Sequence, residues 1–506
     1  MVDRGKLLVA YEMGLGKTPM TIAAIETLRD KGLANNGIVV GIASVKYQWA
    51  KEIKKFSDAS VLVVDGTPLQ RKSQYAEAAN YNYVILNYEQ VVNDWGYVSK
   101  LPRDFVVCDE VTAIKSFKAK RSRRVKRLQT EYLFGLSGQP IENKPEEVYS
   151  IMQWIDTSVL GRFDLFDKTF IVRNGFGGVQ YYKNLPTFHK ALTEAMVRKT
   201  QKDPDVAPYM PKVSEQNRYV EFDTAGKRLY KRIAKELLAD LAAAQDKFGA
   251  NFDVMSHYTG QEDPAANAMR GMIMSKLTCL RMLCDDGSML RLSASRYEKV
   301  QAGLAGVSGG SAYAHELEQA GVLAGITRSP KIDATIELIQ EILDASPDNK
   351  IVVFSFFTPT LNVLQERTQG FTGSVQFKGS MDAKQRDTAK EKFQEDKHCR
   401  LFLSSDAGGY GVDLPNANYL INIDLPWSSG RLVQRNSRII RTSSEFKNVN
   451  LINMLMQGSI EERQYDMLVS KKAIASAILD GKGIDTEGKL TLNLKTLTTF
   501  LQTTEL

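Results

Sequence analysis

Short apolar runs recur through the first part of the chain, and each is followed by a polar or helical stretch. Such runs are typical of parallel strands that are buried on both faces under helices. They lie at Lys6–Ala10, Ile38–Ile42, Val61–Val64, Tyr83–Leu86, Phe105–Cys108 and Tyr132–Leu136. Residues 1–155 therefore predict an α/β unit with a mostly parallel sheet.

The pattern changes in residues 156–330, which hold long helical patterns and few strands. Asp285–Gly325 is rich in Gly, Ala and Ser, which predicts a partly looped segment. The strand rhythm then returns at Ile351–Phe357, Ser374–Phe377, Leu401–Ser404, Tyr419–Ile423 and Val449–Leu455. We expect a first lobe over 1–155, a helical insertion with an inter-lobe linker over 156–330, a second lobe over 331–470, and a helical tail over 471–506.

Composition narrows the class of protein. A chain of 506 residues predicts three or four domain-sized units, and 43% apolar residues are enough for real cores. The sequence has no bilayer-length apolar run and no signal-peptide pattern. Its four cysteines are scattered without a CxxC pair, so we expect a reducing, cytosol-like compartment and neither disulfides nor zinc. The net charge of +7 permits a polyanionic partner.

A phosphate-binding loop is the first candidate site. An apolar strand leads into Gly14-Leu15-Gly16-Lys17-Thr18, and a helical stretch follows. Glycines let backbone N–H groups face a phosphate, and the helix N-terminus favours negative charge. Lys17 can reach the outer phosphates of a nucleotide, and Thr18 can offer its hydroxyl to Mg²⁺. The alternative is a chance glycine turn, but a strand before and a helix after it favour the loop.

Two acids end a later apolar strand. Asp109 and Glu110 follow Phe105–Cys108 directly. A phosphate loop needs an acid on a neighbouring strand to hold Mg²⁺, and Asp109 fits that role. Glu110 can activate the attacking water as a general base. Taken alone, an acidic pair at a strand end is also common in loops.

A basic run follows these acids. It reaches from Lys115 to Arg127 and holds eight Lys or Arg among thirteen residues, with no acid. Such a run can be a solvated helix face, but beside a nucleotide site it favours contact with nucleic-acid phosphates. The candidate contacts are Lys115, Lys118, Lys120 and Arg121.

The second lobe carries two further candidate segments. A strand through Ser404 runs into a turn with Gly408 and Gly409, where the backbone can approach a nucleic-acid strand or the nucleotide cleft. Arg438 and Arg441 lie three residues apart, so on a helix they share one face. The developing charge on a γ-phosphate requires such arginines. A salt-bridged surface helix is the alternative.

Together these segments resemble the Swi/Snf-type ATPases of helicase superfamily two. The resemblance covers roughly Leu7 to Leu479, with the family's motifs in their usual order. The segments that carry it are Glu12–Thr18, Ser44–Trp49, Asn87–Glu89, Asp109–Thr112, Leu136–Asn143, Arg198-Lys199, Met210–Lys212, Ser329–Lys331, Gly379-Ser380 with Arg386, Ser404–Leu414 and Gln434–Arg441.

The resemblance implies two RecA-like lobes that clamp ATP and Mg²⁺ between them. It implies a DNA-stimulated ATPase that tracks along duplex DNA, and that moves DNA or displaces bound proteins without separating strands. It also implies that Gln434 contacts the nucleotide. We expect a monomeric motor without a membrane partner, recruited by another protein and acting in the cytoplasm or at the nucleoid of a bacterium or virus.

This sequence departs from the family pattern in several places. Thr112 stands where the family usually has a histidine, which couples the ATP site to the next motif. Gln139 replaces a threonine, and Ser437 replaces an aspartate. Only Met1–Gly5 precede the first strand, so we expect the family's upstream adenine-contacting segment to be missing.

Three alternatives stay open at this point. The first is a strand-separating or branch-migrating helicase of the same superfamily. The second is a DNA-binding scaffold that has lost hydrolysis through the altered motifs. The third is an enzyme of the same kind that acts on RNA.

Overall fold

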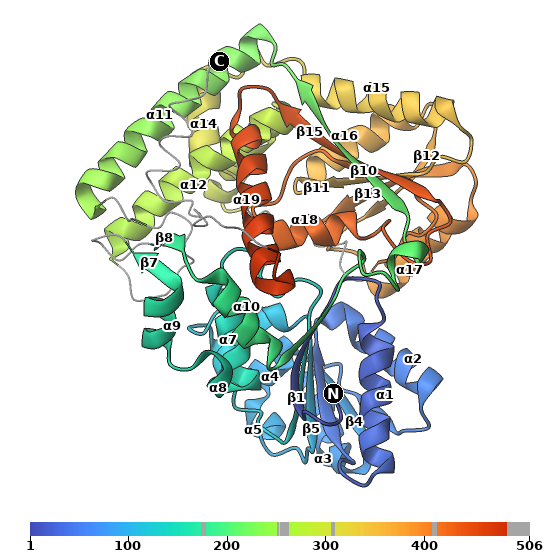
Figure 1. The fold of residues 1–506 in the computed structure, drawn as a ribbon. Helices are drawn as coiled ribbons and strands as arrows, with labels where there is room; N and C mark the ends of the chain where they lie inside the picture. Colours follow the sequence, from blue (N-terminus) through green and yellow to red (C-terminus); the bar gives the residue numbers. More distant parts are fainter. Residues whose placement is uncertain (174–178, 250–251, 253–262, 305–308, 407–411, 483–506) are drawn as a thin grey trace.

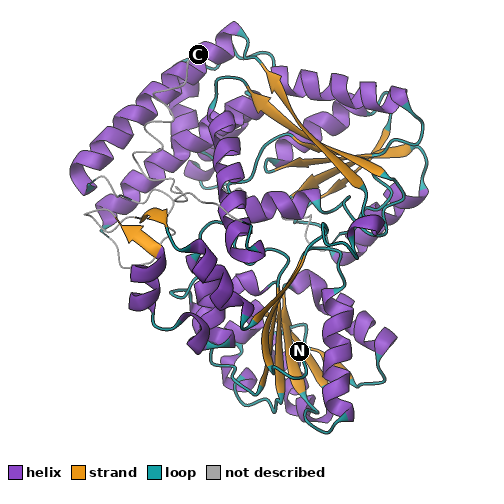
Figure 2. Ribbon diagram, viewed as in Figure 1, coloured by secondary structure: helices purple, strands orange, loops and turns teal. Residues whose placement is uncertain are grey.

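The computed structural model describes residues 1–173, 179–249, 252, 263–304, 309–406 and 412–482. Two parallel sheets, each covered by helices, form two lobes, with lobe 1 below and lobe 2 above in Figure 1. A group of long helices stands beside lobe 2, and Figure 2 shows the two sheets as separate groups of strands. The predicted α/β fold with two lobes is confirmed.

Seven parallel strands form the sheet of lobe 1, in the order β3-β4-β2-β5-β6-β1-β9. The strands are β1 Lys6–Tyr11, β2 Gly37–Gly41, β3 Val61–Val63, β4 Tyr83–Asn87, β5 Phe105–Asp109, β6 Tyr132–Leu136 and β9 Met196–Lys199. The helices of this half are α1 Lys17–Asp30, α2 Lys46–Phe56, α3 Pro68–Glu77, α4 Tyr88–Asn93, α5 Trp95–Val98, α6 Lys120–Val125, α7 Glu146–Ile155, α8 Thr157–Leu160, α9 Phe163–Phe170 and α10 Leu185–Thr193. A small antiparallel pair joins β7 Ile171–Arg173 to β8 Val179–Tyr182.

Six parallel strands form the sheet of lobe 2, in the order β10-β15-β14-β11-β13-β12. The strands are β10 Lys212–Val220, β11 Ile351–Ser355, β12 Gly373–Phe377, β13 Cys399–Ser405, β14 Tyr419–Asn422 and β15 Asn448–Met456. The helices of this lobe are α15 Pro330–Ala345, α16 Thr358–Thr368, α17 Ala383–Glu395, α18 Ser429–Asn436 and α19 Ile460–Asp480. Beside it stand α11 Thr224–Phe248, α12 Pro264–Asp285, α13 Ser288–Gln301 and α14 Ala312–Gln319. Across the described helices, none combines the length and apolar character needed to cross a membrane.

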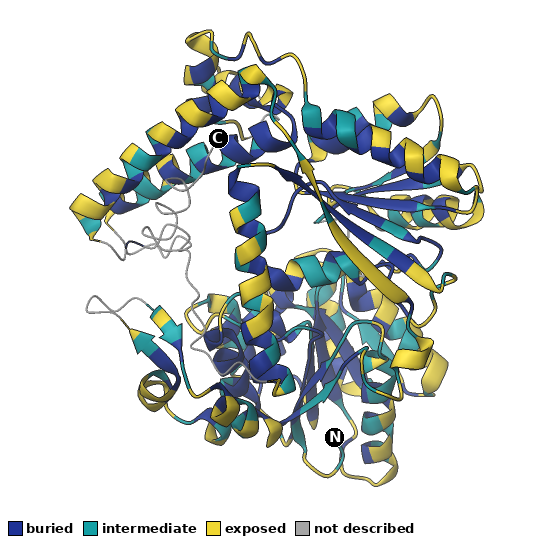
Figure 3. Ribbon diagram, turned by 45° about the horizontal axis from the view of Figure 1, so that its top comes forward, coloured by how far each residue is buried: buried dark blue, intermediate teal, exposed yellow. Residues whose placement is uncertain are grey.

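The apolar runs predicted most strands of the two large sheets to within a few residues at each end, but they missed two strands of these sheets, as well as the small β7-β8 pair. Strand β9 has four residues, and β10 reads KVSEQNRYV with mostly exposed side chains (Figure 3). Both come from the segment 156–330, and each is an edge strand, β9 in lobe 1 and β10 in lobe 2. The domain boundaries stay a prediction. The chain passes from the first sheet to the second between β9 and β10.

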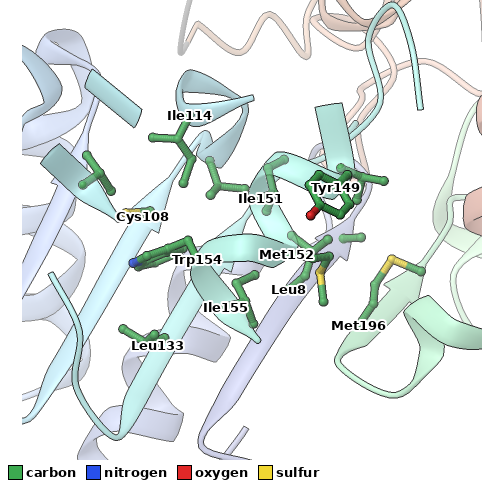
Figure 4. Packing of buried hydrophobic residues seen from close by; sticks show 14 of the residues in the cluster. Leu8, Cys108, Ile114, Leu133, Tyr149, Ile151, Met152, Trp154, Ile155 and Met196 are labelled. Carbon is green, nitrogen blue, oxygen red and sulfur yellow. The ribbon is translucent and has the colours of Figure 1, made fainter. Parts of the chain in front are cut away.

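The core of lobe 1 lies on both faces of its sheet. Successive side chains of a strand point to opposite faces. Leu8 and Ala10 of β1 therefore pack with α7, where Trp154 and Met152 lie (Figure 4). The opposite face of β1 belongs to a second cluster, which packs with α1 and α2. Because both faces are covered, the strand ends are the places where functional groups can reach the surface.

Helix α19 links the two lobes. It follows the last strand of lobe 2, yet Ile474, Ile478 and Leu479 near its end are buried in the core cluster of lobe 1. His189 Nδ1 of α10 lies 2.9 Å from the carbonyl oxygen of Ile478. Figure 1 shows α19 running down from lobe 2 to α10. The last turns of α19 therefore tie lobe 2 to the body of lobe 1.

A buried ion cluster holds the helical group against lobe 2. Lys331 of α15 is fully buried, and its Nζ lies 2.9 Å from Asp285 Oδ1 of α12 and 2.6 Å from Glu461 Oε1 of α19. Burial opposes the charge of Lys331, but the two carboxylates outweigh it and raise the pKa of the ammonium group. The cluster thus joins three helices that are distant in sequence.

Removing the lysine from this cluster should destabilise the protein. Lys331→Met leaves two buried carboxylates without a cation, which typically costs about 3–5 kcal/mol. The free energy of unfolding in urea, followed by circular dichroism, measures the loss. Arg328→Met is the control, because Arg328 is 72% exposed in its pair with Asp333, and such a pair contributes at most about 1 kcal/mol. Equal losses in the two variants would contradict the assigned role of the cluster.

Candidate active site

The phosphate loop joins β1 to α1. Gly14 and Gly16 take left-handed backbone angles, with φ of 82° and 72°, which only glycine adopts without strain. Lys17 is the first residue of α1, and its Nζ donates to the carbonyl oxygens of Tyr11 at 3.0 Å and Glu12 at 3.3 Å. Burial lowers the pKa of Lys17, while Glu110 and Asp109 oppose that shift. The loop therefore holds its lysine close to the two acids.

The two acids lie where β5 ends, beside the loop. Asp109 is the last residue of β5, and its Oδ1 accepts from the backbone N–H of Glu110 at 2.9 Å. Glu110 has a left-handed φ of 49°, which strains a residue that carries a side chain. The Tyr88 hydroxyl donates to the carbonyl oxygen of Asp109 at 2.8 Å and so supports this turn.

The environment of Glu110 favours a proton acceptor. Desolvation by burial, with a further contribution from the Asp109 charge, raises the pKa of Glu110 to about 7. Lys17 and Arg438 act in the opposite direction. A carboxylate in this state is a stronger base than an exposed glutamate, which suits a group that accepts a proton from water.

Two arginines of lobe 2 reach the same place. Arg438 and Arg441 follow α18, and both are buried. Arg438 is close enough to Glu110 to affect its ionisation, and its Nη1 donates to the carbonyl oxygen of Val412. Arg441 approaches the phosphate loop so closely that a Cβ at Gly14 would lie 3.0 Å from its Nη1. The structure thus brings both arginines together with Lys17 and the acids.

A few polar bonds hold the lobes in this arrangement. Ser429 Oγ of α18 donates to the carbonyl oxygen of Glu142 at 2.8 Å. Lys471 Nζ of α19 donates to Asn143 Oδ1 at 3.1 Å. Ser437 Oγ lies 2.9 Å from Met13 Sδ in the phosphate loop. Ser437, which replaces the family's aspartate, therefore lies at the contact between the lobes.

Arg198 is a site residue whose role the sequence pattern did not reveal. From β9 its guanidinium donates to the carbonyl oxygens of Ala10 at 2.9 Å and Gly138 at 3.2 Å, and to Glu12 Oε1 at 3.0 Å. Its Nε also donates to Asp480 Oδ1 at 2.7 Å, at the end of α19. One side chain therefore connects the phosphate loop, the end of β6 and the helix that returns from lobe 2. The pair Arg198-Lys199 by itself carries too little local signal to predict these bonds.

Arg435 was also not predicted, and it supports the two arginines that follow it. It is 3% exposed, its Nε lies 2.5 Å from Asp406 Oδ1, and its Nη2 lies 3.1 Å from Asp424 Oδ1. Burial alone would lower the pKa of Arg435, but the two carboxylates outweigh it and raise the pKa above its ordinary value. These ion pairs fix α18 on the sheet of lobe 2, so that its end faces lobe 1.

The predicted basic run separates into inward and outward residues. Lys115 pairs with Glu142 and Glu147 inside lobe 1, and Arg121 pairs with Glu89. Lys118 and Lys120 are exposed, and so are Arg123 and Arg127, which were not among the four predicted contacts. A role in nucleic-acid binding stays a prediction for all of these residues.

The remaining predicted residues fall in different places. Ser404 is fully buried in β13, and its hydroxyl donates to the carbonyl oxygen of Ser405, so its side chain does not face a surface. Gly408 and Gly409 lie outside the described residues. Gln434 is half-buried on α18, Thr18 is half-buried at the start of α1, and Leu15 lies in the phosphate loop.

The other two departures from the family pattern both lie beside the site. Thr112 is buried in a short 3₁₀ helix, Val111–Ile114, directly after Glu110. The Gln139 side chain donates to the carbonyl oxygen of Ile141 at 3.2 Å. Gln139 therefore stabilises its own turn.

The residues fit a nucleoside triphosphate with Mg²⁺. Arg441 Nε is buried, and it has no hydrogen-bond partner among the described residues. A buried guanidinium N–H that lacks an acceptor, next to a glycine loop, suits a phosphate oxygen. The described residues include no cluster of three or more His, Cys, Asp or Glu side chains that could hold a metal. Asp109 with Thr18 instead suits Mg²⁺, which proteins bind through one or two carboxylates plus substrate phosphates.

Two lobes that face each other across a phosphate loop, with arginines from one and acids from the other, define a helicase-type ATPase core. Comparison with known families agrees with this class. The SNF2-related domain matches residues 3–284, and the helicase conserved C-terminal domain matches residues 331–443. This chain belongs to the SNF2-related family.

Individual relatives are distant. The Bacillus subtilis protein YwqA is 26% identical over 95% of this chain and 47% of its own length. The human DNA repair and recombination protein RAD54B is 23% identical over 95% of this chain and 53% of its own length. The chain thus spans about half the length of these curated relatives. The Pyrococcus furiosus Hef helicase domain shares the fold, with a TM-score of 0.51, 17% identity, and coverage of 92% of this chain and 95% of that one.

The Arg198 connection should matter for nucleotide binding. Arg198→Lys keeps the charge but loses the several directed bonds of the guanidinium, each worth about 1.5–3 kcal/mol when a charged group takes part. We expect the dissociation constant for ATP to rise at least about tenfold, which corresponds to about 1.4 kcal/mol. Titration with a fluorescent ATP analogue measures it. Lys199→Ala is the control, because Lys199 pairs with the exposed Asp205. Unchanged affinity in Arg198→Lys would refute the role.

Proposed function

We propose that this protein is an ATP- and Mg²⁺-dependent motor that moves along duplex DNA and shifts DNA or displaces bound proteins. One observation carries the proposal. Arg438 and Arg441 of lobe 2 converge on the phosphate loop and on Glu110 of lobe 1. In this class of enzyme, arginines that reach across from a second lobe stabilise the charge that develops on the γ-phosphate.

Each residue of the site has a distinct role in this proposal. Lys17 binds the outer phosphates, while Thr18 and Asp109 would hold Mg²⁺. When bound, the metal ion neutralises charge on the phosphate oxygens. Glu110 accepts a proton from the attacking water, and its raised pKa suits that step. The two arginines stabilise the transition state from the opposite side.

Movement would come from opening and closing the lobes. Opening would break the polar bonds of Ser429, Ser437 and Lys471, while the end of α19 would stay packed in the core of lobe 1. The segment between β9 and β10 connects the two sheets, and a change of its backbone angles would allow a hinge motion. Binding of ATP would favour the closed state, and hydrolysis would release it.

Duplex DNA is the proposed track. The basic residues Lys118, Lys120, Arg123 and Arg127 offer positive charge to a phosphate backbone. The relative RAD54B is named as a DNA repair and recombination protein, which supports DNA over RNA. This chain spans about half of RAD54B.

The proposed motor acts as a monomer in a reducing compartment of the cell. Both halves of the ATP site come from one chain, so a second copy is not needed to complete it. The four cysteines are free and buried, which is usual where thiols stay reduced.

Hydrolysis assays test the proposal directly. We expect ATP hydrolysis to rise strongly with duplex DNA, and less with single-stranded DNA or duplex RNA. Glu110→Gln should lower the rate about a hundredfold or more, as expected for loss of a general base, while ATP still binds. Glu131→Gln is a control, because Glu131 is exposed and directly precedes β6, far from the strand ends that carry the ATP site.

Other outcomes point to the alternatives. Stimulation only by single strands would favour a strand-separating helicase, and stimulation only by RNA would favour an RNA enzyme. A folded protein that binds DNA but hydrolyses no ATP under any of these conditions would be a scaffold.

The basic surface can be tested by its salt dependence. We expect Lys118→Gln with Lys120→Gln to reduce the slope of log affinity against log salt by about 0.9 for each DNA phosphate that the variant no longer neutralises. Fluorescence anisotropy with labelled duplex DNA measures the slope. Lys31→Gln with Lys100→Gln is the matched control. Both lysines are exposed and precede β2 and β5. They therefore lie near the starts of the parallel strands, whereas the ATP site lies at the ends of the strands. An equal change in both double variants would exclude a specific contact surface.

A further inference from the structure

Trp49 is a core residue that also makes a hydrogen bond to a candidate site residue. It lies on α2, is 1% exposed, and belongs to the core cluster that packs against one face of the lobe 1 sheet. Its indole Nε1–H points to the ATP site and donates to Asp109 Oδ2 at 2.8 Å. Trp49 thus couples a core helix to the proposed metal ligand.

The Asp109 carboxylate is held by a donor on each oxygen. Trp49 binds Oδ2, and the backbone N–H of Glu110 binds Oδ1. A carboxylate has about four lone-pair positions, so both oxygens can still bind a further partner. An indole can only donate a hydrogen bond. Trp49 therefore neither binds a metal nor accepts a proton, and it acts on the site only through the orientation of Asp109.

We propose that Trp49 is a positioning residue that fixes the Asp109 carboxylate for Mg²⁺, an inference that rests on the proposed function. Its ring is immobilised by close packing, so its N–H has one fixed direction. The terminal torsion of an aspartate is broad, and a fixed donor narrows it. Partners that orient a metal ligand typically contribute about 10- to 100-fold to metal affinity.

The competing explanation is that Trp49 only fills space in the core. The two explanations differ in the effect of the N–H group, which Trp49→Phe removes together with part of the ring. Trp154 offers a matched control in the same lobe (Figure 4). It is also 1% exposed, and its Nε1–H donates to a backbone carbonyl oxygen, that of Leu128, at 3.2 Å. Trp154→Phe therefore makes the same chemical change away from Asp109.

The first experiment measures metal affinity. Mn²⁺ is titrated into the 506-residue chain saturated with ADP, and free Mn²⁺ is followed by electron paramagnetic resonance. We expect Trp49→Phe to weaken Mn²⁺ binding at least about tenfold, with Trp154→Phe within about twofold of the wild type, which fits a carbonyl bond remote from the metal. ADP affinity in EDTA should be the same in all three proteins. Thermal unfolding midpoints report how much each variant loses from packing alone.

The second experiment measures the response to Mg²⁺ in the wild-type protein, and the two variants serve only to assign its signals. The chain has four tryptophans, and ¹⁵N labelling gives each indole N–H its own nuclear magnetic resonance signal. The signal that is absent from the spectrum of Trp49→Phe identifies Trp49, and the one absent from Trp154→Phe identifies Trp154. We expect the Trp49 signal to shift when Mg²⁺ is added to the ADP complex, while the Trp154 signal stays in place.

The outcomes distinguish failure of the positioning role of Trp49 from failure of the metal role of Asp109. Unchanged Mn²⁺ affinity in Trp49→Phe, an equal loss in Trp154→Phe, or a Trp49 signal that ignores Mg²⁺ would overturn the positioning role alone. Failure of the folded wild-type protein to bind Mn²⁺ with ADP would overturn the metal role of Asp109, and with it the proposed function.

Discussion

The arrangement of the site depends on the hydrogen bonds of one side chain, the guanidinium of Arg198. It binds two carbonyl oxygens at the ends of β1 and β6, a carboxylate of the phosphate loop and a carboxylate at the end of α19. A planar group with five N–H donors can serve several partners at once, which a lysine cannot. Since α19 comes from lobe 2, this side chain relates the position of that lobe to the shape of the phosphate loop.

Buried charged groups are paired where they hold lobe 2 together, but only partly paired at the candidate ATP site. The positive charges of Lys331 and Arg435 are each balanced by two carboxylates, and both side chains connect elements of lobe 2 and its helical group. At the site, burial lowers the pKa of Lys17 and Arg441, raises that of Glu110, and leaves Arg441 Nε without a described partner. Incomplete compensation is costly in a core, but it is useful where a charged substrate is to bind.

The strands, the glycine turn between β1 and α1 and the acidic pair at the end of β5 could be predicted because their signals are local. A strand that is buried on both faces needs an unbroken apolar run, and a phosphate loop needs its glycines, lysine and threonine in one short segment. Strand β10 could not be predicted in this way, because it is an exposed edge strand with polar side chains. The opposite orientations of Lys115 and Lys118 were equally hidden, since the acids that pair with Lys115 come from a later loop and helix.

By itself, the sequence determined the class of fold and marked Lys17, Asp109 and Glu110 as candidates for one site, because strand ends and motifs are encoded over a few residues. Only the tertiary structure decided which distant side chains complete that set. Arg198, Trp49 and the end of α19 reach the site from separate parts of the chain. Their roles arise from directed hydrogen bonds between distant residues, 60 positions apart for Trp49 and Asp109 and 282 for Arg198 and Asp480, and no periodicity along the sequence records such contacts.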